Sequence, residues 1–187
     1  MLKLIIIEGT DNIGKDTIIS KLCELFDTVT LIHCGSPKTK VFQSQYQDKL
    51  FETYAHNIVH GLYDNTDCVI MNRSHIGEYV YGQLYRGRSA EDIKKMISHV
   101  DYLLLSSPLL TVKYVQLLSS SIELRKKYDD NKSLSKMNDN LMKKENELFL
   151  EAYENSPLDK HLIYVNDEDG FLPKEKIFQE VINFLNK

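Results

Sequence analysis

The chain has no tryptophan, only four prolines and only three cysteines among its 187 residues. Cys23, Cys34 and Cys68 are widely spaced and lie in or beside apolar segments, which favours reduced core thiols over a disulfide framework or a zinc site. No apolar run approaches the length of a membrane span, and no signal sequence precedes the first predicted strand. These absences predict a cytosolic protein that does not associate with membranes.

A surplus of positive charge is also missing, because 23 Lys and Arg residues are outnumbered by 27 Asp and Glu residues and the net charge is −4. Proteins that coat DNA or a membrane need an excess of Lys and Arg, so nucleic acid is not expected as a partner. With 42% hydrophobic and 27% charged residues, and without repeats or linkers, the chain predicts one compact domain over residues 1–187. Its ligand should be small.

What the sequence does contain is a phosphate-binding pattern near its start. The apolar run from Leu4 to Ile7 predicts a strand buried on both faces, and apolar residues at helical spacing from Ile18 to Leu25 predict a helix. Between them, the spacing G-x-x-x-x-G-K is typical of a P-loop, whose backbone amides and helix N-terminus bind phosphate oxygens. The residues expected to hold the phosphates of a nucleotide are Gly9, Thr10, Asp11, Asn12, Ile13, Gly14, Lys15, Asp16 and Thr17.

One residue departs from this pattern where a metal ion is expected. A Ser or Thr normally follows the Gly-Lys pair and offers its hydroxyl to Mg²⁺, whereas this chain has Asp16. A carboxylate is a good Mg²⁺ ligand, but beside phosphates its negative charge is tolerable only with a bound cation. The strand predicted at 67–71 is followed by Asn72, where P-loop enzymes usually carry an acid that serves the Mg²⁺ shell. Asp16 and Asn72 are therefore the predicted metal residues.

Further apolar runs alternate with helical patterns along the rest of the chain. Strands are predicted at 28–34, 67–71, 101–106 and 162–165, and helices at about 41–63, 78–85, 89–99, 109–127, 134–155 and 172–185. This alternation predicts an α/β fold, namely a three-layer P-loop NTPase fold with a five-stranded parallel sheet flanked by helices. Such a fold gathers the P-loop, Lys38, Asn72–Arg73 and the Arg125 region at one edge of the sheet.

Phosphoryl transfer needs positioning and charge neutralisation more than covalent work, and the gathered residues fit that need. Lys15 and the loop amides would hold ATP as the donor with Mg²⁺ beside them, and Arg73 would bind an acceptor or transferring phosphate. The polar, charged loop at about 125–134 is predicted to be a short lid that excludes water, and its alternative is a solvated turn. The candidate cations of this lid are Arg125, Lys126 and Lys132.

The stretch IIIEGTDNIGKDT resembles the opening of thymidylate kinases, whose loop reads E-G-x-D-G-x-G-K-[ST]-T. Asn72-Arg73-Ser74 and Tyr81 resemble the D-R-[YS] segment and the A-Y-Q of that family, and NRSHIGEYVYGQLYRG is closer still to the thymidylate-kinase-like and deoxynucleoside kinase proteins of bacteriophages. The resemblance implies that Arg73 holds the acceptor phosphate, Tyr81 lies by the base or sugar, and Thr17 touches the α-phosphate of the donor. It also implies a homodimer, located in the host cytoplasm if the protein is viral.

Three positions differ from the family pattern. Asn12 stands in place of a loop glycine, Asp16 in place of the Mg²⁺-binding Ser or Thr, and Asn72 in place of an Asp. The last two changes compensate each other in charge, since one carboxylate is gained and one is lost beside the predicted metal. We hypothesise that the anionic Mg²⁺ ligand has moved from the end of the third predicted strand, at 67–71, to the helix after the P-loop.

The predicted acceptor is a deoxynucleoside monophosphate, by the resemblance a pyrimidine such as dTMP or dUMP, and the product is the diphosphate. An anionic acceptor needs cations, which Lys38 and Arg73 supply. A deoxynucleoside kinase instead needs a general base, usually a Glu just after the second strand, and residues 34–38 contain no acid. Phosphorylation of a nucleoside 5′-hydroxyl is therefore the first alternative.

Two further classes of protein are alternatives to a kinase. A GTPase would need a guanine-reading N-K-x-D, and residues 131–134 read N-K-S-L, which disfavours it. A non-catalytic nucleotide-binding protein is the second alternative, because the two metal-site departures are what a decayed enzyme would show. The presence of Lys15, Arg73 and a cationic lid argues against such decay.

Overall fold

The computed structural model describes residues 2–34, 56, 66–130 and 133–187. Its strands are β1 at Leu2–Gly9, β2 at Val29–His33, β3 at Cys68–Asn72, β4 at Leu110–Leu118 and β5 at Lys160–Tyr164. They form a five-stranded sheet in the order β2-β3-β1-β4-β5, and every neighbouring pair is parallel. The prediction of a five-stranded parallel sheet is therefore confirmed.

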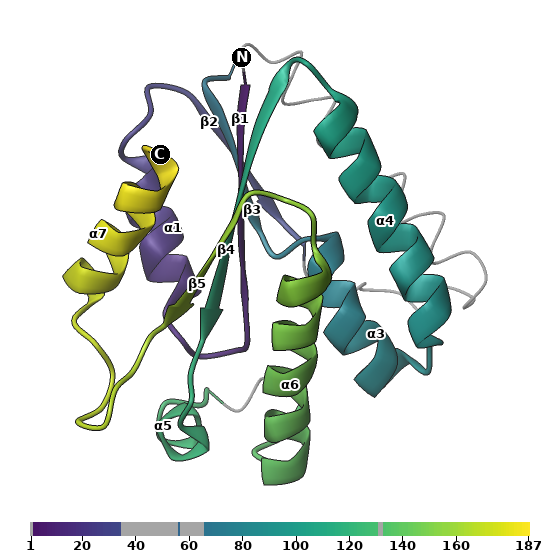
Figure 1. Cartoon of the computed structure of the whole chain (residues 1–187). Coiled ribbons are helices and arrows are strands. Elements are labelled where there is room, and N and C mark those ends of the chain that lie inside the picture. The colour runs from purple at the N-terminus through teal and green to yellow at the C-terminus, as the bar shows by residue number, and fades with distance from the viewer. Residues whose placement is uncertain (1, 35–55, 57–65, 131–132) are drawn as a thin grey trace.

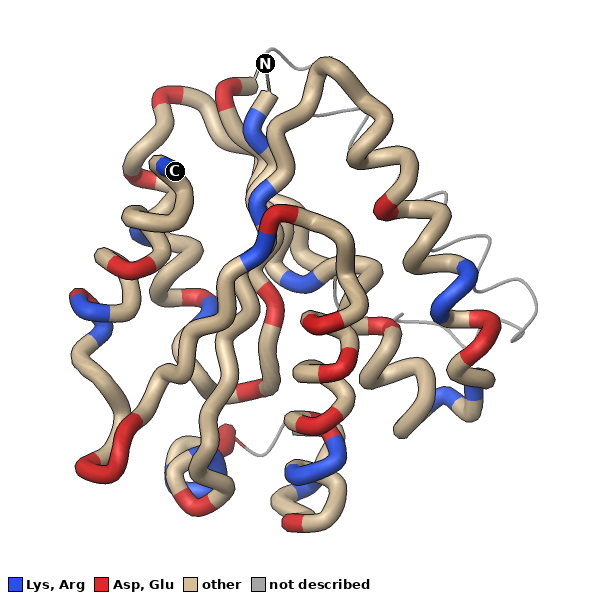
Figure 2. Tube along the Cα trace, in the orientation of Figure 1, with Lys and Arg blue, Asp and Glu red and all other residues tan. Residues whose placement is uncertain are grey.

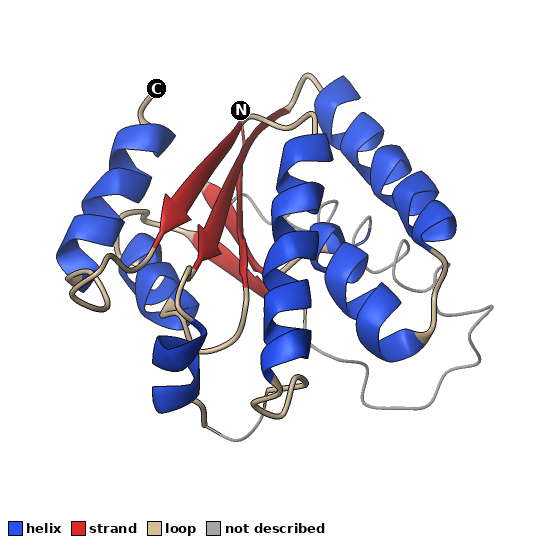
Figure 3. Cartoon of the chain, turned by 60° about the horizontal axis from the view of Figure 1, so that its bottom comes forward, coloured by secondary structure: helices blue, strands red, loops and turns tan. Residues whose placement is uncertain are grey.

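Helices cover both faces of this sheet. They are α1 at Lys15–Cys23, α3 at Glu78–Arg86, α4 at Ala90–Ser106, α5 at Ile122–Lys127, α6 at Asp139–Asn155 and α7 at Lys174–Leu185, with a short 3-10 helix at His75–Gly77 before α3. Figure 1 shows α1 and α7 on one face of the sheet and α3, α4 and α6 on the other. The view in Figure 3 shows the same arrangement as a sheet between two helical layers, which is the predicted three-layer architecture.

The burial of β1 explains why its sequence is a continuous apolar run. Leu4 and Ile6 belong to the core that β1 shares with α3, α4 and α6, whereas Ile5 and Ile7 belong to the core shared with α1 and α7. All four side chains are buried. A strand covered by helices on both faces needs apolar side chains on both, so the polar alternation of a half-exposed strand is absent.

The strand predicted at 101–106 is wrong, because these residues form the last part of α4. A short apolar run does not by itself distinguish a strand from a buried helix. The buried apolar side chains of α4 keep a spacing of three and four across the expected boundary: Ile93, Met96, Val100 and Leu104. This spacing places one stripe of the helix on the core over its whole length.

The fourth strand is β4, which lies where a helix was predicted at 109–127. Tyr114 and Leu118 join the core beneath α3, α4 and α6, whereas Val115 and Leu117 join the opposite core, an alternation that a strand produces and a helix does not. Ser107, predicted to cap that helix, is instead the C-cap of α4. Of the predicted helix, only the last part is helical, as α5.

Other boundaries shift by smaller amounts. Ser89 caps α4 as predicted, with its hydroxyl accepting from the Asp92 amide at 3.1 Å. Helix α6 begins at Asp139, after the Asn138 cap, rather than at 134. The predicted helix at 41–63 lies outside the described residues, apart from His56, which is helical.

Because all strands are parallel, their carboxyl ends meet at one edge of the sheet, which is the lower edge in Figure 1. β1 lies between β3 and β4, and the register pairs Ile7 with Asn72 and Gly9 with Leu117. The P-loop therefore starts beside the end of β3. In such sheets, ligands bind at the carboxyl edge, where neighbouring strands send their connections to opposite faces.

The charges of the described chain are mixed in sign. Figure 2 shows Lys and Arg interspersed with Asp and Glu along the trace. Within the parts of the chain that the structure describes, no helix has the length and apolar character needed to cross a bilayer.

Candidate functional site

The P-loop backbone has the left-handed turns that its glycine pattern predicts. Gly9 has φ 146°, and a Cβ atom there would lie 2.3 Å from the Leu117 carbonyl oxygen, so a larger residue does not fit. Asn12, which stands where thymidylate kinases have a glycine, has φ 62°. Asn adopts the left-handed region more readily than most residues that carry a Cβ. Asn12 therefore adopts the left-handed conformation that this position of the loop requires.

Lys15 begins α1, and its ammonium donates a hydrogen bond to the Thr10 carbonyl oxygen across the loop. The residue is only 7% exposed. This burial, together with the positive charge of Arg73, lowers the pKa of Lys15 to about 7. A phosphate anion in the loop would favour the protonated form, so the geometry couples anion binding to the charge of Lys15.

Three side chains from three elements meet beside the P-loop. Asn72, at the end of β3, donates from Nδ2 to Asp16 Oδ1 at 2.7 Å. The same nitrogen lies 3.1 Å from Nδ1 of His33, at the end of β2. The two residues predicted to serve a metal are thus neighbours. His33 was not predicted, although its place at the carboxyl end of a strand is the signal that could have found it.

Arg73 follows β3 with φ 67°, a left-handed conformation that is uncommon for a residue with a long side chain. This turn directs the guanidinium over the P-loop, where it pairs with the Asp11 carboxylate and donates to the Gly9 carbonyl oxygen at 3.3 Å. It also donates to the Tyr81 hydroxyl at 2.7 Å. Tyr81 is 6% exposed and lies edge-on to Phe149. Arg73 and Tyr81, both predicted for the acceptor, are therefore in direct contact.

Glu8, which was not predicted, holds the loop that carries Arg73. It is fully buried at the end of β1, and its Oε1 accepts from the Ser74 amide, from the Ser74 hydroxyl at 3.0 Å and from the Gly77 amide at 3.1 Å. Burial raises the pKa of the Glu8 carboxyl, while Arg73 and the bonds from Ser74 oppose that rise. A charged residue inside an apolar strand was the available sequence signal.

Some of these groups line an open cavity of about 550 Å³ at the carboxyl edge. It is lined by Asp11, Asn12, Gly14, Lys15, Asp16, Thr17, His33, Asn72, Arg73, Asp130 and Ser133. Most of the predicted P-loop residues thus line one cavity together with Asn72 and Arg73. Asp130 and Ser133 come from the predicted lid, and neither was singled out in the sequence.

Arg125 is not among the residues that line this cavity. Its side chain is 1% exposed and forms an ion pair with Glu145 of α6 at 2.6 Å. It also donates to the Met142 carbonyl oxygen at 3.0 Å, and Glu145 accepts from the Tyr85 hydroxyl at 2.7 Å. In this structure, Arg125 ties α5 to α6 and does not face the P-loop.

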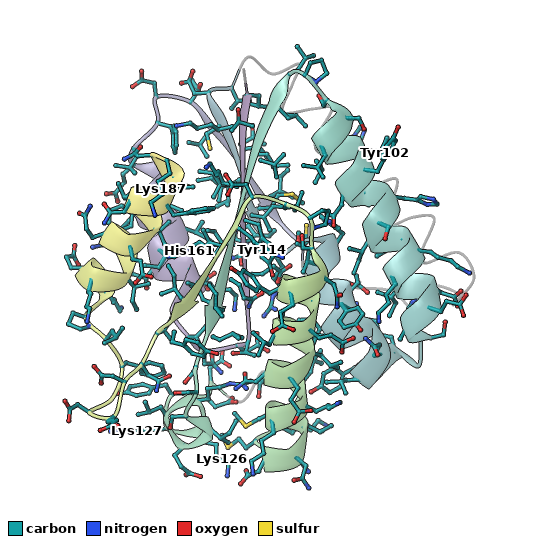
Figure 4. The ribbon with its side chains drawn as sticks, in the orientation of Figure 1. Tyr102, Tyr114, Lys126, Lys127, His161 and Lys187 are labelled. Atoms are coloured by element: carbon teal, nitrogen blue, oxygen red, sulfur yellow. The ribbon has the colours of Figure 1, made fainter. Side chains whose placement is uncertain are left out.

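Of the other predicted cations, the structure describes Lys126 but not Lys38 or Lys132. Lys126, which Figure 4 labels beside α5, pairs with Asp139 at the start of α6. Lys38 and Lys132 lie outside the described residues. Among the described residues, the cations that line the cavity are therefore Lys15 and Arg73.

No family model and no curated protein matches the chain. Solved structures do match. The YorR protein from Bacillus subtilis, solved with phosphorylated GDP, has a TM-score of 0.70 at 19% identity, over 98% of this chain and 95% of that one. Thymidylate kinase from Ehrlichia chaffeensis has a TM-score of 0.63 at 16% identity, over 98% of both chains. Deoxyadenosine kinase from M. mycoides, with bound dATP, has a TM-score of 0.58 at 15% identity, over 98% and 100%.

These likenesses show that the chain has the fold found in nucleotide and nucleoside kinases with a P-loop. At these sequence identities of 15–19%, the matches show the fold and do not show the function. The cavity brings together the glycine-containing loop after β1, two cations and a polar group of Asp16, His33 and Asn72.

Proposed function

We propose that this protein is a kinase that transfers the γ-phosphoryl group of ATP, with Mg²⁺, to a deoxynucleoside monophosphate. The observation that carries the proposal is the convergence of Lys15 and Arg73 on one cavity at the P-loop. Each cation lies on a backbone that holds it there, Lys15 at the first turn of α1 and Arg73 in a left-handed turn. Phosphoryl transfer depends chiefly on positioning and on neutralising phosphate charge.

In this proposal, the P-loop amides and Lys15 bind the donor phosphates, and Thr17 touches the α-phosphate. Arg73 binds the acceptor phosphate, for which it exchanges its contact with Asp11. The Tyr81 hydroxyl supports this role, because it accepts a hydrogen bond from the Arg73 guanidinium and limits its orientation. Tyr81 is not among the residues that line the cavity, and by the resemblance to thymidylate kinases it would lie by the base or sugar of the acceptor.

Lys38 would supply a second cation to the acceptor. The segment 125–134 would close as a lid, and Arg125 could act on the transferring phosphate only by leaving Glu145. We also propose that the protein works as a cytoplasmic homodimer with small nucleotides as its ligands.

Bound Mg²⁺ supplies further charge neutralisation at the phosphates. The residues fit such an ion, because Asp16 and Asn72 lie within 2.7 Å of each other and offer a carboxylate and an amide, whose oxygens are hard ligands. Asp16→Asn should raise the Mg²⁺ concentration for half-maximal activity at least about tenfold, as loss of a metal ligand does. Asn72→Asp should stay active. A Mg²⁺ titration at fixed ATP measures both, and an unchanged dependence in Asp16→Asn would refute the idea that the anionic ligand has moved to α1.

The proposed acceptors are pyrimidine deoxynucleoside monophosphates such as dTMP and dUMP, with the diphosphate as product. The support is the resemblance of the P-loop and of the Asn72 to Arg86 segment to thymidylate kinases. The shared fold with deoxyadenosine kinase keeps nucleoside phosphorylation as a second candidate.

A coupled ADP-release assay with ATP and Mg²⁺ tests the proposal on a panel of deoxynucleoside monophosphates and the matching nucleosides. Turnover that requires a monophosphate is the expected result, and the panel identifies the base. Turnover with nucleosides alone would move the assignment to the second candidate. ATP binding without turnover on any acceptor would identify a non-catalytic nucleotide-binding protein.

A further inference from the structure

His75 and Asp101 form a buried polar pair that has no part in the reaction proposed above. The Nε2 atom of His75 lies 2.8 Å from Oδ1 of Asp101, and the two side chains are 1% and 2% exposed. His75 lies in the short 3-10 helix, two residues after Arg73, whereas Asp101 lies on α4. The pair therefore connects the loop that carries Arg73 to a helix that covers the sheet.

The apolar surroundings of this pair favour a role other than stability. Asp101 is the only charged residue in the buried stripe of α4, whose other members are Ile93, Met96, Val100 and Leu104. Burying a carboxylate and an imidazole costs free energy, and a well-packed apolar pair is often at least as stable in such a place. What a hydrogen bond adds is a preferred distance and direction between the two groups.

The turn at Arg73 is attached to two different elements. On one side is β1, where the Ile7 carbonyl oxygen accepts from the Arg73 amide at 3.0 Å and the Glu8 carboxylate accepts from the residues that follow. Contacts to one strand set the distance of the turn from that strand. A second attachment, from His75 to Asp101 on α4, also sets its orientation. The direction of the Arg73 side chain depends on that orientation.

We propose that His75 and Asp101 are positioning residues for Arg73, which hold its turn so that the guanidinium faces the acceptor phosphate. Neither residue lines the cavity, so both act through the turn. The acceptor is the one in the function proposed above, on which this inference rests. Positioning is separable from stability, because an apolar pair can supply the packing of these two side chains but not the hydrogen bond between them.

The test is the double replacement His75→Leu with Asp101→Leu, which removes the hydrogen bond and leaves no charge buried. Its free energy of unfolding should stay close to that of the unaltered protein, whereas the KM for the deoxynucleoside monophosphate should rise about tenfold or more. The KM for ATP should stay within about twofold, because neither residue belongs to the P-loop. Asp101→Asn keeps an oxygen acceptor for the imidazole and should have a near-normal acceptor KM.

Val181→Ala is the matched control. Val181 is buried on α7, in the core on the opposite face of the sheet, so its truncation lowers stability without contact with the turn. Both KM values should be unchanged in this variant, and an equal rise of the acceptor KM here would overturn the proposal. The proposal is also wrong if the double variant keeps an acceptor KM within about twofold of normal, or if it does not fold.

Amide hydrogen exchange gives a readout that needs no turnover. In the double variant, the amides of Ser74 and Gly77 should exchange faster than in the unaltered protein, whereas those of β1 should not. Faster exchange at these two amides, in a protein that phosphorylates no acceptor, would leave the hold on the turn in place and refute the kinase. Unchanged exchange at both would overturn the positioning role and leave the kinase standing on its own assay.

Discussion

Glu8 is the only charged residue between the apolar run of β1 and the first glycine of the P-loop. Burying a carboxylate costs free energy unless hydrogen bonds compensate for the lost water, and here one oxygen accepts three. A Cβ atom on Gly77 would lie 3.0 Å from that oxygen, so the loop fits closely around the carboxylate. Through Ser74 and Gly77, Glu8 fixes the left-handed turn that directs Arg73 over the P-loop.

Replacement of Glu8 should therefore affect the acceptor more than the donor. Glu8→Ala leaves three donors without their acceptor and should lower the free energy of unfolding by about 3 kcal/mol or more. In steady-state kinetics, the KM for the acceptor should rise more than the KM for ATP. Glu8→Gln keeps an oxygen acceptor and should restore most of both properties. Equal losses for donor and acceptor would speak against a positioning role.

The lowered pKa of Lys15 predicts proton uptake on ATP binding. In the free protein, Lys15 has a pKa of about 7 and is largely neutral at pH 8, whereas bound phosphate stabilises the protonated form. ATP binding at pH 8 should take up close to about one proton, ATP affinity should fall as the pH rises above 7, and the uptake should vanish below about pH 6. Calorimetry in buffers of different ionisation enthalpy measures it. Lys15→Arg is the control, because a guanidinium is already charged at pH 8.

At the scale of elements, α5 is short and is held to α6 by a buried ion pair. Arg125 and Glu145 are each 1% exposed, and Asn146 links the same region to the residue after β4 by donating to the Ser119 carbonyl oxygen at 2.8 Å. Tyr85 connects this ion pair to α3. These contacts hold α5 against α6. The segment after α5 contributes Asp130 and Ser133 to the lining of the cavity.

The Arg125–Glu145 pair gives a prediction that separates a structural from a catalytic role. Removing one partner of a buried ion pair leaves the other charge buried and unpaired. Arg125→Met and Glu145→Gln should therefore each lower the free energy of unfolding by about 3–5 kcal/mol. The double replacement Arg125→Met with Glu145→Leu should recover most of this loss, because apolar side chains can replace a buried pair. Denaturant unfolding measures the stabilities. If Arg125 also acts on the transferring phosphate, the stable double variant will have a low kcat; near-normal turnover would exclude that role.

At the scale of the whole molecule, several large apolar side chains are exposed close together in the sequence. The last turns of α4 and the turn after it expose Tyr102, Leu103, Leu105 and Leu109, at 71%, 50%, 53% and 61%. Tyr102 points away from the sheet (Figure 4). Exposed apolar side chains that gather in one place are typical of contact surfaces between proteins.

If the proposed homodimer exists and uses this surface, a charge placed on it should weaken association. Leu105→Lys should shift the mass from dimer to monomer in light scattering at micromolar concentrations and leave the fold unchanged, because Leu105 is half-exposed. The matched control is Lys95→Glu, an exposed change earlier on the same helix. A dimer that persists in Leu105→Lys would move the interface elsewhere, and a monomeric unaltered protein would refute the dimer.

The sequence by itself determined the features that depend on neighbouring residues. The P-loop was predicted because a buried strand, glycines at fixed spacing and an amphipathic helix follow each other within Leu2 to Leu25, and β2, β3 and the capped start of α4 were likewise local patterns. Only the tertiary structure separated α4 from β4. Both segments contain apolar runs of similar length. Whether such a run forms a helix or a strand depends on whether its buried side chains face one core or two.

The composition of the cavity was also decided by the tertiary structure. His33 and Asp130 are distant in sequence from the P-loop, and only the strand order brings them beside it. Arg125 was predicted to be a lid cation because it lies in a polar, charged loop that leaves the carboxyl edge of the sheet, but Glu145, twenty residues later, is its partner. A sequence shows which charges exist, whereas their pairing depends on distances in space, and burial makes those pairings far stronger than they would be in water.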